Sequence, residues 1–95
     1  MAHVLIEHQV GDFEAFLDVF TRDGPRRRQI GAWGGTVFRI HGTPDGVFVL
    51  IEFDTLEHAR DFAGSLELGQ AAEWVTNRVS TPRVTVLEHV LDTAE

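Results

Sequence analysis

Residues Gly34 to Asp54 decide the fold, and they read GGTVFRIHGTPDGVFVLIEFD. Two runs rich in β-branched and aromatic residues, Thr36–His41 and Val47–Phe53, flank the segment Gly42–Gly46. That segment contains a proline, which restricts φ, and two glycines, which accept a positive φ, so it has the chemistry of a turn. The stretch therefore predicts a β-hairpin with a loop of about five residues.

Upstream of the hairpin, the sequence predicts a strand over residues 2–10 and then an interrupted helix. Asp12 is a suitable N-cap for the helix, whose apolar side chains recur at helical spacing at Phe13, Phe16, Leu17 and Phe20. Gly24-Pro25 should interrupt it. We interpret Arg26–Arg28 as a solvent-exposed helix end, with a phosphate site as the alternative. Residues 31–35 are expected to be a flexible connection into the hairpin.

Downstream of the hairpin, Thr55 is a suitable cap for a second helix, and residues 83–91 predict the last strand. Gly64-Ser65 should interrupt the second helix and start a further piece that ends near Val75. The stripe that this helix should bury is made of the apolar side chains Leu56, Ala59, Phe62, Ala63 and Leu66.

The order of these elements predicts an α+β fold of the ferredoxin-like βαββαβ type, in one domain that covers residues 1–95. Strands 2–10 and 47–53 are expected in the centre of the sheet and parallel to each other. Two interrupted helices should cover one face. The other face would then be apolar and uncovered, and we assign Val49 and Ile51 to it. An open apolar face predicts an interface, most simply with a second copy of the chain.

The composition excludes several kinds of chemistry. The 95 residues contain no Cys, Lys or Tyr, and all eight basic residues are Arg, so thiol nucleophiles, Schiff-base lysines and tyrosine acids are excluded. A net charge of −7 argues against binding to nucleic acid. The opening MAHVLIEHQ resembles neither a signal peptide nor a membrane span, so we expect a cytoplasmic protein without a membrane partner.

The candidate site combines an imidazole with a carboxylate. We expect His41 to pair with Val47 in the hairpin, which places Thr36 opposite Glu52. We expect His8 and Glu52 to converge at one end of the sheet with Thr36, because parallel neighbours bring corresponding strand ends together. His8 would be the acid or base, and Glu52 would orient it. Trp33 and Phe38 would form the walls of a pocket. The alternative is a structural pair in which the two groups only satisfy each other's hydrogen bonds.

The other charged and imidazole side chains predict less. We place Arg39 and Glu7 on the open face, where they form an interfacial ion pair or, alternatively, Arg39 binds a substrate anion. His3, His41 and His89 should lie near the other end of the sheet. Their spacing is not that of metal ligands, so we expect no metal site.

Four stretches of the sequence resemble a known group of proteins. They are HQVGDFEAF with DVF after it, GGTVFR, VLIEFDTLEHARDFA, and SLELGQAA with PRVTVLE at the end. In order and spacing they resemble the dimeric α+β barrel proteins, the superfamily of the antibiotic biosynthesis monooxygenases, and within it short bacterial cyclase-like proteins. The resemblance implies a homodimer with a shared barrel and a pocket in each subunit. Its members include cofactor-free oxygenases, haem-degrading enzymes and isomerases.

From the residues and the resemblance together, we expect a small homodimeric enzyme or enzyme-like protein. It would act without a cofactor on an apolar cyclic or aromatic metabolite, by oxygenation or by proton-transfer cyclisation. The alternative is a non-catalytic, small-molecule-binding or stress-associated dimer with the same pocket. The sequence does not identify the substrate or decide between these two functions.

Overall fold

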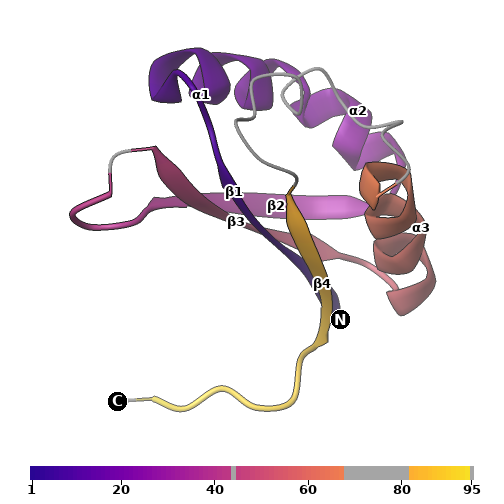
Figure 1. Cartoon of the computed structure of the whole chain (residues 1–95). Helices are drawn as coiled ribbons and strands as arrows, with labels where there is room; N and C mark the ends of the chain where they lie inside the picture. The colour runs from indigo at the N-terminus through magenta and orange to yellow at the C-terminus, as the bar shows by residue number, and fades with distance from the viewer. Residues whose placement is uncertain (44, 68–81, 95) are drawn as a thin grey trace.

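The computed structural model describes residues 1–43, 45–67 and 82–94. Within them the chain has the ferredoxin-like α+β architecture, with a four-stranded sheet in the order β2-β3-β1-β4 and helices on one side of it (Figure 1). The elements are β1 (Ala2–Gln9), α1 (Phe13–Arg22), α2 (Gly24–Gln29), β2 (Ala32–Arg39), β3 (Gly46–Phe53), α3 (Leu56–Glu67) and β4 (Arg83–Glu88). The predicted fold class and the central position of β1 and β3 are confirmed.

The predicted direction of the central pair is wrong, because β1 and β3 run antiparallel. Helices α1 and α2 carry the chain back to the end of the sheet at which β1 begins, so β1 and β2 run in the same direction. The hairpin then reverses the chain, and β3 runs opposite to both. His3 consequently lies opposite Glu52, and His8 lies opposite Val47, at the other end of the strand.

The helix boundaries follow from local capping and from packing. The Asp12 side chain accepts a hydrogen bond from the backbone N–H of Ala15 at 3.1 Å, and Thr55 Oγ1 accepts one from His58 N–H at 3.1 Å. Both predicted caps are confirmed, as is the break before α2. The predicted interruption at Gly64-Ser65 is wrong, since α3 continues to Glu67. Glycine costs a helix only about 1 kcal/mol relative to alanine. The further helical piece expected after it lies outside the described residues.

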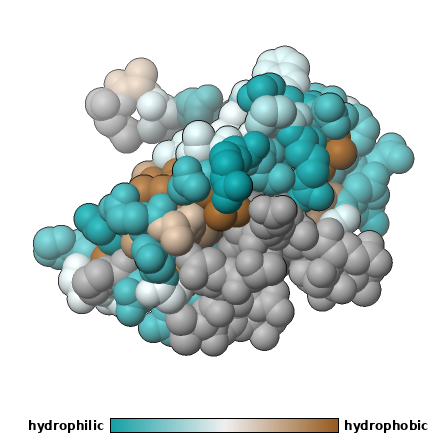
Figure 2. Space-filling view, turned by 90° about the horizontal axis from the view of Figure 1, so that it is seen from above, coloured by the Kyte–Doolittle hydropathy of each residue, from teal (hydrophilic) through white to brown (hydrophobic). Residues whose placement is uncertain are grey.

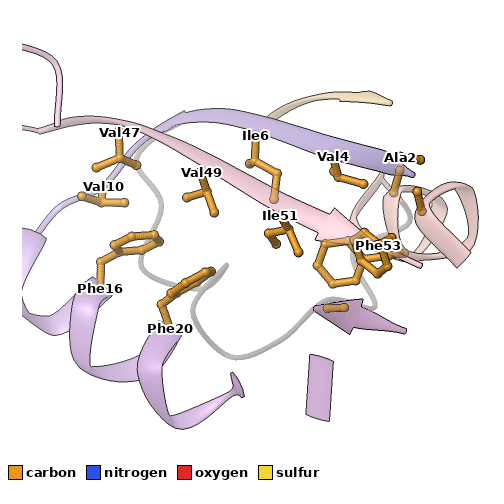
Figure 3. Packing of buried hydrophobic residues seen from close by; sticks show 14 residues of the cluster. Ala2, Val4, Ile6, Val10, Phe16, Phe20, Val47, Val49, Ile51 and Phe53 are labelled. Atoms are coloured by element: carbon orange, nitrogen blue, oxygen red, sulfur yellow. The ribbon is translucent and has the colours of Figure 1, made fainter. Parts of the chain in front are cut away.

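The core lies between the sheet and the helices (Figure 3). Val4 and Ile6 of β1 alternate with half-exposed neighbours and are fully buried. Phe16 and Phe20 of α1 pack against this side, with ring centroids 5.9 Å apart. α3 contributes the buried side chains Ala59, Phe62 and Ala63. Apolar burial of this kind is the main driving force of folding.

The face assignment of β3 was also wrong. Val49 and Ile51, which were expected on the open face, are fully buried beneath the helices. Phe48 and Leu50 point the other way and are only partly buried. Both sets are apolar, so the alternation along β3 does not show which of them faces the helices.

The hairpin has a different register from the expected one. Val47 lies opposite Arg39 rather than His41, and Leu50 lies opposite Thr36. Residues 32–35, which were expected to belong to a flexible connection, are part of β2. Its pairing with β3 is irregular between Ala32 and Gly34. The hairpin loop is closed by a hydrogen bond from Ile40 N–H to the Gly46 carbonyl at 2.9 Å.

The helical side of the molecule presents mostly hydrophilic residues where it is coloured, with smaller apolar patches (Figure 2). Among the described residues, no helix is both long enough and apolar enough to cross a lipid bilayer.

Candidate functional site

The open face of the sheet carries the candidate site. Leu5, Phe48 and Leu50 lie on it and are half-buried, and Phe38 is 52% exposed. No helix in the described part of the chain covers these side chains, because the helices pack against the opposite face. The face therefore combines an apolar centre with access for a ligand or another protein surface.

One end of the open face contains an imidazole–carboxylate pair. Nε2 of His3 lies 3.5 Å from Oε2 of Glu52, across the antiparallel β1–β3 ladder. The side chains are 19% and 40% exposed, so both are reachable from solvent. The pair borders a depression of about 310 Å³, which is lined by His3, Gly34, Gly35, Thr36, Leu50 and Glu52. The depression is thus small, and its lining is mixed, with Leu50 as its apolar side chain.

Glycine gives this depression its room. Gly34 lies opposite Glu52 on β2, and a Cβ placed on it would meet no atom within 4 Å. The floor beside the pair is therefore backbone and open space rather than side chain. A flat ring could approach the sheet closely at this point, with its polar group toward His3 and Glu52.

The arrangement is chemically suited to proton transfer. A carboxylate next to an imidazole orients the ring and provides a second proton acceptor, which is the usual construction of a general acid or base. A third titratable group lies nearby, because the His89 ring is 6.3 Å from the His3 ring and His89 Nε2 lies 3.0 Å from Asp92 Oδ1. Among the described residues, however, no three such side chains are arranged to hold a metal ion. The predicted grouping of His41 with His3 and His89 is wrong, because His41 lies at the hairpin, at the other end of the sheet from His3.

The predicted pair of His8 and Glu52 is wrong. His8 lies on the helical face, is buried, and packs edge-on against Phe16 with ring centroids 5.2 Å apart. Glu52 lies on the open face, at the other end of the central strands. Glu52 does lie beside an imidazole, but the imidazole is that of His3. The rule that a hairpin reverses the chain after a crossover helix could have identified His3.

The other predicted site residues are divided between the two faces. Thr36 lines the depression with Glu52, and Phe38 lies further along the same open face. Trp33 is 67% exposed at the irregularity of β2 and is not part of the depression's lining. Arg39 lies on the helical side, where its guanidinium is 4.7 Å from the centre of the Phe13 ring. The roles predicted for these residues remain predictions.

The expected contact between Arg39 and Glu7 is wrong, because the two residues lie on opposite faces of the sheet. Glu7 lies on the open face, opposite Phe48 and Arg83 of the neighbouring strands.

A second depression, of about 390 Å³, lies at the hairpin end and is lined by Glu7, His8, Gln9, Ile40, Thr43, Gly46 and Arg83. Glu7 and His8 belong to opposite faces of the sheet, so they do not converge on one ligand.

A third His–carboxylate pair lies at the start of α3. Nδ1 of His58 is 2.7 Å from Oδ1 of Asp54, and both side chains are partly exposed. The hydrogen bond that the His58 ring donates to Asp54, followed by the negative charge of Asp54, raises the pKa of His58 above its ordinary value. The same hydrogen bond lowers the pKa of Asp54. His58 is therefore more easily protonated than a free imidazole.

This pair predicts a defined pH dependence. The contribution of His58 to stability is complete below its unfolded pKa, about 6.5, and is lost as the pH rises through the raised folded pKa. The contribution of Asp54 is present above its unfolded pKa, about 3.9, and is lost as the pH falls through the lowered folded pKa. Both contributions are therefore complete only between these two unfolded values.

We expect Asp54→Asn to lower the His58 pKa, as measured by NMR titration of the ring protons. Glu57→Gln is the control, because Glu57 acts on the ring through its charge without a hydrogen bond. It should lower the His58 pKa by a smaller amount. Equal shifts in the two variants would contradict the assignment of the effect to the Asp54 hydrogen bond.

Solved structures with the same fold place the chain in a structural class. A protein from Bordetella bronchiseptica described as an antibiotic biosynthesis monooxygenase has a TM-score of 0.73 and 18% identity, over 95% of this chain and 97% of that one. A dimeric ferredoxin-like protein from an uncultured marine organism has a TM-score of 0.62 and 10% identity, over the full length of both chains. A variant of MhuD with two manganese protoporphyrin IX molecules per active site has a TM-score of 0.63 and 15% identity, also over the full length of both chains.

These similarities confirm, at the level of fold, the resemblance to the antibiotic biosynthesis monooxygenases and the dimeric α+β barrel proteins. No protein-family model matches the sequence, and no curated protein matches it.

Proposed function

We propose that this protein is a cytoplasmic homodimer that binds an apolar cyclic or aromatic metabolite and transfers a proton on it without a cofactor. The observation that carries the proposal is the 3.5 Å contact between His3 and Glu52 at the wall of the small depression. The remaining lining is glycine, threonine and leucine. Polar groups that converge beside an apolar side chain, here Leu50, can fix the orientation of a small molecule.

A second copy of the chain is the proposed cover of the open face. Phe38 and Leu87 are exposed apolar side chains of that face, next to half-buried Leu5 and Leu50. Pairing two such faces would remove these side chains from water, which favours association to the extent that it exceeds the cost of lost translational and rotational freedom. The dimeric ferredoxin-like protein with the same fold supports this arrangement.

The proposed chemistry begins with a ring carbon that bears a hydrogen next to a carbonyl group. The Glu52 carboxylate or the neutral His3 ring accepts this proton, and the electron pair of the broken C–H bond moves to the carbonyl oxygen to give an enolate. The group that has accepted the proton stabilises the negative charge on the enolate oxygen. In a cyclisation, the enolate carbon then attacks a second carbonyl carbon of the same molecule, the C=O π bond opens, and the resulting alkoxide takes back the proton. In an oxygenation, the enolate transfers its electrons to dioxygen, a C–O bond forms, and the peroxide anion takes back the proton to give a hydroperoxide.

A non-catalytic binding protein is the second candidate. Phe16 and Phe20 fill the space between α1 and the sheet, and the buried His8 ring packs against Phe16. The helical side is therefore packed rather than hollow at this point. On this reading the depression binds the ligand, and the His3–Glu52 pair orients it without transferring a proton.

One probe distinguishes the two candidates. 2-Tetralone is a bicyclic ketone with exchangeable hydrogens next to its carbonyl, and proton transfer on it is measured as deuterium incorporation in D2O by NMR. The catalytic proposal predicts saturable shifts of the Gly34 and Thr36 amide signals together with exchange faster than in buffer. Glu52→Gln should slow the protein-dependent exchange on the order of a hundredfold.

Glu7→Gln is the matched control, because Glu7 lies on the same face, has the same charge and does not line the depression. It should leave the exchange rate unchanged. Binding without exchange would favour the non-catalytic candidate. If neither the Gly34 nor the Thr36 amide signal shifts when 2-tetralone is added, the depression is not its binding site under either candidate function.

A further inference from the structure

Positive charge is concentrated at the corner between α1 and α2. Arg22, Arg26, Arg27 and Arg28 are four of the eight basic residues, in a chain of net charge −7. α2 packs against β2, so this corner belongs to the helical layer and is separated by the sheet from the His3–Glu52 depression. The cluster therefore needs an explanation independent of the proposed active site.

Nearby carboxylates neutralise only part of this charge. Arg22 Nε lies 3.5 Å from Asp18 Oδ2. Asp23 accepts hydrogen bonds from Arg26 Nε at 3.0 Å and from Arg26 Nη2 at 3.4 Å. Its second oxygen is also 3.6 Å from Arg27 Nη1. Two carboxylates thus face four guanidinium groups, and among the described residues Arg28 has no acidic partner.

Arg27 is held rigidly but is incompletely hydrogen-bonded. The residue is only 8% exposed, and its guanidinium lies 3.7 Å from the centre of the Phe20 ring. Within the described part of the chain, its buried Nη1 atom has no hydrogen-bond partner. Burial lowers the pKa of Arg27, Asp23 opposes that change, and the charges of Arg26 and Arg28 add to it. A buried cation next to like charges is favourable only if a negative group compensates it.

One guanidinium nitrogen of Arg27 and one of Arg28 lie near the point that a side chain on Gly24 would occupy. An ideal Cβ on Gly24 would lie 3.6 Å from Arg28 Nη1 and 3.8 Å from Arg27 Nη2. Any larger residue would occupy the point that faces both guanidinium groups. Arginine forks match the geometry of phosphate and carboxylate oxygens, and their charge-assisted hydrogen bonds are stronger than neutral ones.

We propose that Arg27 and Arg28 form an oxyanion-binding site above Gly24, for the phosphate or carboxylate group of a small acidic ligand. Arg27 is the fixed half of the site, because Phe20 and burial hold it in place. Arg28 is the exposed half and brings the charge that Asp23 does not neutralise. Hydrogen bonds from both guanidinium groups to one anion would compensate the charge of Arg28 and the part of the Arg27 charge that Asp23, shared with Arg26, does not neutralise.

The test is an NMR titration with inorganic phosphate at constant ionic strength, which follows the Gly24 amide and the arginine Nε–H signals. The wild-type protein should show saturable shifts at these groups. Arg28→Gln should weaken binding about tenfold or more, because a charge-assisted hydrogen bond is lost. Gly24→Ala should weaken it similarly by filling the gap. A Cβ there makes only ordinary van der Waals contacts, so the variant should fold.

Arg22→Gln is the matched control. It removes the same charge from the same corner, at a residue that Asp18 already neutralises, and it should change phosphate affinity less than about twofold. Equal weakening by Arg22→Gln and Arg28→Gln would mean diffuse electrostatic attraction and would overturn the proposal. Unchanged affinity in Gly24→Ala, or shifts that never saturate, would overturn it as well.

Discussion

Replacing Leu50 with glutamate is expected to convert the proposed dimer into a monomer. Leu50 lies in the centre of the open face, between Leu5 of β1 and Thr36 of β2. A carboxylate at this position would be buried without a partner when two such faces pair, and burying an unpaired charge costs several kcal/mol. We expect the dissociation constant of the dimer to rise on the order of a hundredfold or more, measured by light scattering after size-exclusion chromatography.

The single chain should still fold, because position 50 points away from the helices and is only half-buried. Ala15→Glu is the matched control, since it adds the same charge on the exposed surface of α1. It should leave the dimer intact. If both variants dissociate equally, or if the wild-type protein is a monomer at micromolar concentration, the second copy does not cover this face.

Replacing Gly31 with alanine is expected to destabilise the protein in two ways. Gly31 follows α2 with a φ of +103°, a conformation that costs a residue with a Cβ roughly 1–2 kcal/mol. A Cβ at this position would also lie 2.5 Å from Asp54 Oδ1 and 2.7 Å from His58 Nδ1. The methyl group must therefore push Asp54 and His58 apart, and the variant should lower both the melting temperature and the His58 pKa.

Gly42→Ala separates these two effects. Gly42 has a φ of +83°, and a Cβ there would meet nothing within 4 Å. It should show the conformational cost alone, without a change in the His58 pKa. If Gly42→Ala destabilises the protein as much as Gly31→Ala does, the contact with the Asp54–His58 pair contributes nothing measurable.

The sequence predicted the elements of the fold because their signals are local. Asp12 and Thr55 bond to backbone N–H groups three residues ahead of them, and the Phe spacing of α1 identifies its buried side without reference to the sheet. The break between α1 and α2 follows equally from Gly24-Pro25. The continuation of α3 through Gly64 was not predictable in this way, because packing against the sheet outweighs a small helix-propensity cost.

The candidate site was only half predicted. Glu52 and Thr36 share one depression, as expected, although the register differs by two residues. A shift of two residues preserves the face of each side chain, whereas a shift of one would not. His8 was chosen over His3 because the central strands were taken as parallel, and the direction of a strand decides which of its ends meets a neighbour.

What the sequence determined by itself was the order of strands and helices, their caps and the fold class, since each depends on a few neighbouring residues. Only the tertiary structure decided that β3 buries Val49 and Ile51 rather than Phe48 and Leu50, that His3 meets Glu52, and that Arg27 is buried against Phe20. Both sets of β3 side chains are apolar, and several histidines and arginines could have filled these roles. Long-range pairing between segments distant in the sequence selects among them, and no local pattern records that choice.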